Sequence, residues 1–93
     1  MTVRQLDAKI SRIEGFHVRI RHPRGRGVRS DARIADHYRF GRARSGNDNV
    51  REWIDGRFRP FYPEYEIDVL RADGRRAHGN QRLAAPRDSY RDD

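Results

Sequence analysis

The sequence predicts a single α+β domain in which an antiparallel sheet of about four strands carries two helices on one face. Two segments place large apolar residues at the spacing of an amphipathic helix. Other segments alternate apolar and polar residues with the period of two that is typical of half-buried strands. Because 93 residues can build only one modest core, we expect one domain over residues 1–88 and a frayed tail over residues 89–93.

The N-terminal part of the chain is predicted to form a helix followed by two strands. The helix spans residues 3–14, starts at a capping box that begins with Thr2, and ends at a glycine. The strands cover residues 16–21 and 34–40. Proline and glycine interrupt the chain between them, so the two strands could pair as a hairpin with a long Arg-rich loop.

The C-terminal part is predicted to form a second helix and two further strands. The helix begins at Asn47 or Asp48 and ends before a proline. A third strand covers residues 64–69, and the Asp-Gly pair at 73–74 turns the chain into a fourth strand over residues 75–79. No internal repeat is expected.

The predicted core combines the apolar faces of these elements. Its members are Leu6, Ile10, Ile13, Phe16, Val18, Ile20, Ile34, Tyr38, Phe40, Val50, Trp53, Ile54, Phe58, Ile67 and Val69. This set is small for a monomer, so a homodimer that hides Phe61, Tyr62 and Tyr65 is an alternative to a monomer.

The positive charge is concentrated in the first half of the chain. Residues 1–46 hold twelve Lys or Arg against four Asp or Glu, a net charge of +8, whereas residues 47–93 hold nine against ten. Such clustering indicates an acidic partner, nucleic acid above all. Twenty of the 21 basic residues are Arg, which fits bidentate phosphate binding but also the codon bias of a GC-rich genome.

The candidate binding residues lie on the first two predicted strands, on the loop that joins them and just after the second strand. They are Arg19, Arg21, Arg24, Arg26, Arg29, Arg39, Arg42 and Arg44. An alternative applies to the three on the strands, Arg19, Arg21 and Arg39, because Glu64, Glu66 and Asp68 alternate on a neighbouring strand and could neutralise them. The strand order decides between an exposed Arg ladder and a set of ion pairs.

A second candidate surface follows the second helix. Arg57, Arg59, Phe61 and Tyr62 have the composition of a protein-interaction hot spot, or they simply pack in the core. This surface would suit an acidic protein partner.

No catalytic residue, metal site or cofactor is predicted. The chain has no cysteine and no catalytic or nucleotide-binding fingerprint. The one enzymatic alternative is a small nuclease in which His17 and His37 lie side by side as acid and base. No apolar run is long enough to span a membrane and no signal peptide is evident, so we expect a cytoplasmic protein.

In size and composition this short, Arg-rich α+β chain resembles the small proteins of phages and mobile elements, such as anti-CRISPR inhibitors. The resemblance carries no residue over. It implies binding to a ribonucleoprotein effector and obstruction of its access to target DNA. The leading hypothesis is a non-catalytic basic module that contacts nucleic acid, or the nucleic-acid channel of a ribonucleoprotein. The alternative is an inhibitor or adaptor that binds an acidic protein surface.

Overall fold

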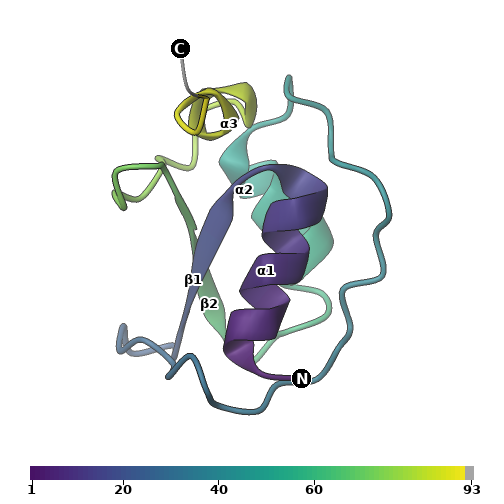
Figure 1. Ribbon diagram of the computed structural model, residues 1–93, viewed down its shortest axis with the longest axis vertical. Coiled ribbons are helices and arrows are strands. Elements are labelled where there is room, and N and C mark those ends of the chain that lie inside the picture. Colours follow the sequence, from purple (N-terminus) through teal and green to yellow (C-terminus); the bar gives the residue numbers. More distant parts are fainter. Residues whose placement is uncertain (92–93) are drawn as a thin grey trace.

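The computed structural model describes residues 1–91 and alternates helices with strands (Figure 1). In chain order the elements are α1 (Val3–Glu14), β1 (His17–Arg21), α2 (Val50–Trp53), the π-helix η1 (Ile54–Phe58), β2 (Glu66–Leu70) and α3 (Ala84–Asp88). The predicted α+β class is confirmed. Within the described residues, no helix is both long and apolar enough to cross a membrane.

The start and end of α1 agree with the prediction. The Thr2 hydroxyl accepts a hydrogen bond from the Gln5 amide at 3.2 Å, and the Gln5 side chain accepts one from the Thr2 amide at 2.8 Å. Gly15 ends the helix with a φ of 86°, a left-handed conformation that favours glycine. The buried face of the helix packs against β1.

The second helix begins at Asn49, two residues after the first of the predicted caps. Asn49 and Glu52 form a reciprocal capping box, whereas Asp48 instead pairs with Arg44. The helix continues as a π-helix, which widens the turn. The wider turn brings Trp53 and Phe58, five residues apart, onto the same buried face.

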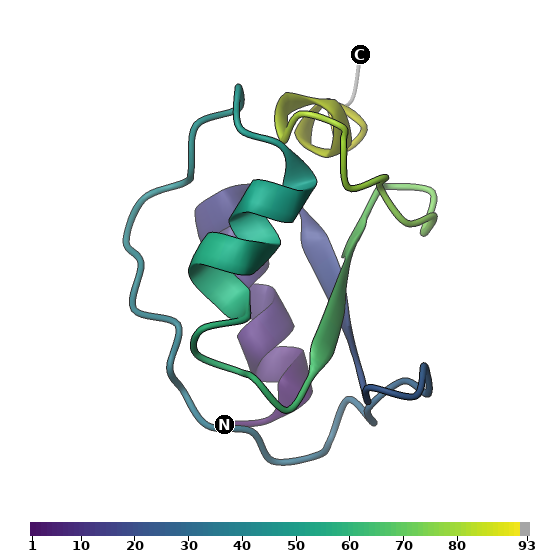
Figure 2. The same cartoon turned by 180° about the vertical axis from the view of Figure 1, so that it is seen from behind.

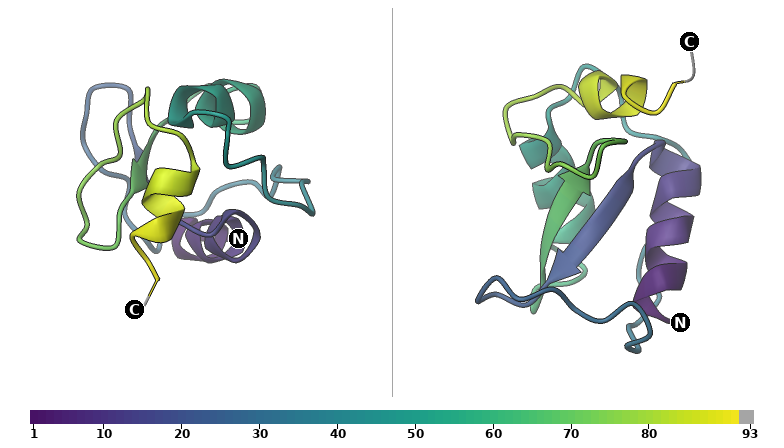
Figure 3. Two further views of the ribbon diagram at one scale, coloured as in Figure 1. Left: turned by 90° about the horizontal axis from the view of Figure 1, so that it is seen from above. Right: turned by 60° about the vertical axis from the view of Figure 1, so that its left-hand side comes forward.

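The sheet has two strands rather than four. Strands β1 and β2 are antiparallel, and Arg19 faces Asp68 at the centre of the register. Val18 and Ile20 of β1 point toward the core, as do the residues opposite them on β2. The helices α1 and α2 lie on this side of the sheet, and no helix formed by residues 1–91 covers the other side (Figures 2 and 3).

The predicted strand over residues 34–40 is wrong. This segment belongs to an extended connection over residues 35–48 that runs along the outside of the helices (Figure 1). Its apolar pattern arises because Ile34 and Tyr38 anchor it to the core. The predicted strand over residues 75–79 is reduced to a single bridge between Leu70 and Arg76.

Most of the predicted core is buried. The exceptions are Ile13, Phe40 and Ile54, which are partly buried against it. Four further residues complete the core, namely Val3, Tyr62, Ala77 and Leu83.

The expected absence of a repeat is wrong, because the chain contains the same helix, strand and returning segment twice. The first unit is residues 1–34 and the second is residues 48–83. Six backbone hydrogen bonds of the first unit recur at equivalent positions of the second. In the first unit these bonds are Val3 N to Ala32 O, Arg4 N to Ser30 O, His22 N to Arg26 O, Gly25 N to His22 O, Val28 N to Ile20 O and Ile34 N to Met1 O. In the second they are Val50 N to Gln81 O, Arg51 N to Gly79 O, Arg71 N to Arg75 O, Gly74 N to Arg71 O, Ala77 N to Val69 O and Leu83 N to Asp48 O.

Each unit ends in a returning segment, which we call an arm. The first arm is residues 22–33 and the second is residues 71–82. Both turn through a glycine with positive φ, 93° at Gly25 and 84° at Gly74, as three-residue hairpin loops require. Each arm then runs back beside its own strand and accepts hydrogen bonds from the first amides of its own helix.

The C-terminal segment, expected to be frayed, makes specific contacts in its first residues. The Tyr90 hydroxyl donates to the Leu70 carbonyl and accepts from the His17 amide at 3.1 Å. Ser89 accepts a hydrogen bond from the Ala72 amide at 2.9 Å. The expectation for Asp92 and Asp93 lies outside the described residues.

Candidate nucleic-acid interface

The two arginines of β1 share one aspartate of β2. Asp68 has only 3% of its surface exposed, yet it lies on the sheet face opposite the helices. Arg19 Nη2 donates to it at 3.0 Å and Arg21 Nε at 2.8 Å. The alternative of cross-strand ion pairs therefore holds for both arginines, and they do not form an open phosphate-binding ladder.

The three arginines predicted on or after the second strand lie on the connection instead. Arg39 and Arg42 are exposed there. The Arg44 side chain is held by two nearby residues, because its Nε donates to Asp48 at 2.9 Å and its Nη1 to the Glu52 carbonyl at 3.0 Å. The structure therefore does not bring these arginines onto the sheet beside Arg19 and Arg21.

The first arm presents the basic residues that remain available. Arg24 and Arg26 flank Gly25 at its exposed tip, and neither makes an ion pair within residues 1–91. Arg29 pairs with Asp31 at 3.2 Å, but both side chains are mostly exposed, at 84% and 68%. With Arg33, the arm carries four arginines and one aspartate, a net charge of +3.

The second arm is equally basic, which the sequence analysis missed. It holds Arg71, Arg75, Arg76 and Arg82 against Asp73, again a net charge of +3. Arg75 Nε lies 3.9 Å from the Asp73 carboxylate, and both side chains are exposed to solvent. Arg76 is exposed and forms no ion pair in the described part of the chain. The signal that could have revealed this arm is the Gly-Arg pair at both tips.

A groove lies beside each strand, between it and the start of the helix of the same unit. The first is lined by Val3, Arg4, Val18, Ile20, Val28 and Ser30. The second is lined at the equivalent positions by Val50, Arg51, Ile67, Val69, Ala77 and Gly79. The grooves therefore repeat the internal symmetry of the fold.

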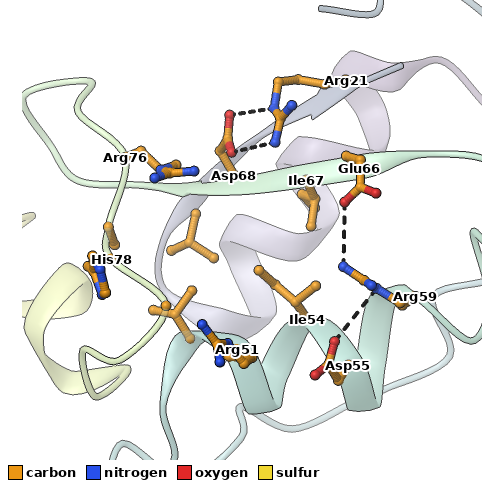
Figure 4. A pocket seen from close by; sticks show the side chains of 14 residues that line it. Arg21, Arg51, Ile54, Asp55, Arg59, Glu66, Ile67, Asp68, Arg76 and His78 are labelled. Atoms are coloured by element: carbon orange, nitrogen blue, oxygen red, sulfur yellow. Dashed lines mark hydrogen bonds and ion pairs between the residues drawn. The ribbon is translucent and has the colours of Figure 1, made fainter. Parts of the chain in front are cut away.

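The second groove is lined by side chains of both charges (Figure 4). In one half, Arg59 is engaged by Asp55 at 3.6 Å and by Glu66 at 3.4 Å. In the other half, Arg51, Arg76 and His78 surround an apolar floor. Neither Arg51 nor Arg76 has an ion-pair partner among residues 1–91, so this half extends the basic surface of the second arm.

The predicted protein-interaction surface is divided between the core and the exterior. Tyr62 is buried and its hydroxyl donates to the Ala35 carbonyl at 2.7 Å. Arg57 donates to the buried carboxylate of Glu14 at 2.7 Å. Arg59 is exposed and Phe61 has 39% of its surface exposed. Only these two of the four predicted residues face solvent.

Glu14 forms a buried polar cluster that the sequence analysis did not anticipate. Its carboxylate accepts hydrogen bonds from the Tyr38 hydroxyl, the Arg44 amide, Arg57 and Arg87. Burial by itself would raise the pKa of Glu14, but these hydrogen bonds outweigh burial and hold its pKa below the usual value. Burial and the neighbouring Glu14 raise the pKa of Tyr38. The cluster ties α1 to the connection, η1 and α3, so its role is structural.

The histidines do not form the acid–base pair considered above. The His17 ring lies 3.1 Å from Asp7 and packs beside Tyr90, whereas the His37 ring packs on Tyr62. No contact joins the two imidazoles in the described part of the chain. Among the same residues, no group of three potential metal ligands occurs.

No known family model, curated protein or solved structure matches the chain. The chemistry of the site rests on its own side chains. The basic arms can bind phosphate groups through guanidinium donors and exposed backbone.

Proposed function

We propose that the protein is a non-catalytic module that binds the phosphate backbone of nucleic acid through its first arm. The observation that carries this proposal is the pair Arg24 and Arg26, exposed at the tip of an ordered hairpin and without acidic partners in the described residues. Guanidinium groups bind phosphates bidentately, and the glycine between the two arginines lets the backbone approach closely.

The location of the ion pairs favours the arms over the sheet and the helices. Arg19 and Arg21 are held by Asp68, and Arg57 and Arg87 are held by Glu14. The first arm keeps a net charge of +3, and its one ion pair within residues 1–91 is the exposed pair of Arg29 and Asp31. Contacts to phosphate carry little sequence information, so we expect weak sequence preference and a steep dependence on salt.

Fluorescence anisotropy of labelled duplex DNA and single-stranded RNA tests this proposal. On the duplex, four arginine–phosphate contacts give a salt slope of about −3.6, so affinity should fall roughly 150-fold between 50 and 200 mM salt. The variant Arg24→Glu/Arg26→Glu should bind much more weakly. Replacement of two arginines should also reduce the salt slope by about 2.

The matched control is Arg12→Glu/Arg91→Glu, which makes the same change in net charge at exposed positions outside both arms. It should retain most of the affinity of the unmodified protein. Equal weakening by both variants would show that total charge, not the first arm, determines binding. Absence of binding at 50 mM salt would reject the proposal and favour an acidic protein partner. Emission from Trp53, which is fully buried, reports whether each variant is folded.

A further inference from the structure

The two units of the fold are related by an approximate half-turn. Arg19 and Asp68 occupy equivalent positions of the two units, and they face each other at the centre of the sheet. The half-turn also exchanges the two pairs at the ends of the sheet. It carries His17 onto Glu66 and Leu70 onto Arg21, and each of these residues faces its partner across the strands. This reciprocal pattern is that of an isologous contact, so the pseudo-twofold axis passes through the centre of the sheet.

The half-turn places the two arms at opposite ends of the sheet. β1 runs toward the first arm and β2, antiparallel to it, runs toward the second. Both arms extend from the side of the sheet that faces away from the helices (Figures 1 and 3). Five strand residues at about 3.3 Å each separate the arms by at least about 17 Å.

The surface between the arms carries less net charge than either arm. Arg19 and Arg21 share the single carboxylate of Asp68 there, which leaves a net charge of +1 for the three, whereas each arm has a net charge of +3. The basic surface therefore has two separate centres rather than one continuous stripe. Arg51 adds to the second centre from the adjacent groove (Figure 4).

We infer that the partner is a double-stranded nucleic acid, bound at two points, with the second arm contacting a second stretch of phosphate backbone. The inference rests on the proposed function of the first arm. A duplex has its own twofold axes, and proteins with twofold symmetry align with them. When the pseudo-twofold axis of this protein coincides with that of the duplex, the arms meet equivalent phosphates of opposite strands. A single strand offers no such pair of backbones.

The two arms are not identical, and the difference sets their relative strength. Asp73 stands at the second tip where Arg24 stands at the first. Arg75 and Arg76 are the exposed basic residues nearest that tip. The first arm therefore binds more strongly, and the second adds affinity that only a partner with two backbones can use.

The decisive experiment compares Arg75→Glu/Arg76→Glu with Arg24→Glu/Arg26→Glu and with the control Arg12→Glu/Arg91→Glu. The probes are a duplex of about 20 base pairs and a single strand of the same length, titrated at several salt concentrations. The second-arm variant should bind the duplex about tenfold more weakly and reduce its salt slope by about 2, while binding of the single strand changes little. Arg75→Gln/Arg76→Gln, which introduces no acid, should show the same effect at smaller size.

Three results would overturn the inference, and they differ in meaning. If the second-arm variant binds the duplex as tightly as the control while the first-arm variant loses binding, the second arm does not contact the duplex and the proposed function stands. If the second-arm variant weakens duplex and single strand equally, both arms bind phosphate but the partner is not specifically double-stranded. If the unmodified protein binds neither probe, the proposed function fails together with the inference.

Discussion

Replacement of Glu14 with alanine should destabilise the fold more than any surface substitution. The Glu14 side chain is completely buried and accepts from four donors, of which Arg57 lies at 2.7 Å and Arg87 at 3.2 Å. Their guanidinium groups are themselves largely buried, with 18% and 19% of each side chain exposed. Alanine would remove the carboxylate partner of both cations and of the Tyr38 hydroxyl, and would leave each cation only a backbone carbonyl, that of Arg42 for Arg57 and that of residue 14 for Arg87.

Loss of one partner from a buried ion pair lowers the free energy of unfolding by about 3–5 kcal/mol. A chain of this length has a total stability of roughly 5–14 kcal/mol. For a domain of this size, 1 kcal/mol corresponds to about 4–8 °C in Tm, so the variant should melt at least about 12 °C lower.

Urea and thermal unfolding followed by Trp53 fluorescence measure this effect directly. Trp53 is the single tryptophan and its indole N–H donates to Tyr38 within the same cluster, at 3.1 Å. The control is Asp31→Ala, which removes an exposed ion pair with Arg29 and should change stability by less than about 1 kcal/mol. A Glu14→Ala variant that melts within a few degrees of the unmodified protein would refute the structural role of the cluster.

Two further predictions concern acid stability and the arm turns. Because the folded pKa of Glu14 lies below its unfolded value, the stabilisation it provides is present above about pH 4.3 and is lost as pH falls through the folded pKa. Acid titration of Glu14→Gln should show a flatter decline in stability than the unmodified protein, and an equally steep decline would contradict this assignment. Gly25→Ala and Gly74→Ala should each lower stability by about 1–2 kcal/mol through left-handed backbone strain alone, since an added Cβ meets no atom within 4 Å. Gly27→Ala, equally free of contacts and without positive φ, should be near neutral in the same urea titrations.

The elements that the sequence predicts well are those defined by local patterns. The capping box at Thr2 and the left-handed Gly15 define α1, and strict alternation defines β1 and β2. The segment over residues 34–40 was wrongly predicted as a strand. Its buried residues, Ile34 and Tyr38, are four apart, and a connection that packs one side on helices gives the same spacing as a strand. Local spacing alone does not separate these cases.

The repeat escaped detection because few side chains are conserved between the units. Arg4 and Arg51 follow the helix caps, and Gly25 and Gly74 form the turns, but the helices and strands between them differ. The spacing also changes, by 47 residues at the helix starts and by 49 at the turns. Shared backbone hydrogen bonds reveal the equivalence, and these are not visible in the sequence.

The candidate site was predictable only where charge was local. The first arm was predicted because Arg24, Arg26 and Arg29 lie close together in a Gly-containing loop of the strongly basic first half of the chain. The neutralisation of Arg19 and Arg21 depended on the strand register, which brings Asp68 from 49 residues away along the chain. The Glu14 cluster was out of reach for the same reason, since Arg87 lies 73 residues from it.

The repeat gives the chain the character of a dimer folded from one polypeptide. Neither unit buries its own apolar surface, because β1 finds its strand partner in the other unit and Phe16 packs edge-on against Trp53 at 5.1 Å. The connection over residues 35–48 joins the two units covalently and is itself anchored in the core by Tyr38, so it keeps the effective concentration of one unit near the other high. Cleavage within this connection should leave two fragments that associate by the same sheet pairing. Folding would then become a bimolecular event whose midpoint depends on protein concentration.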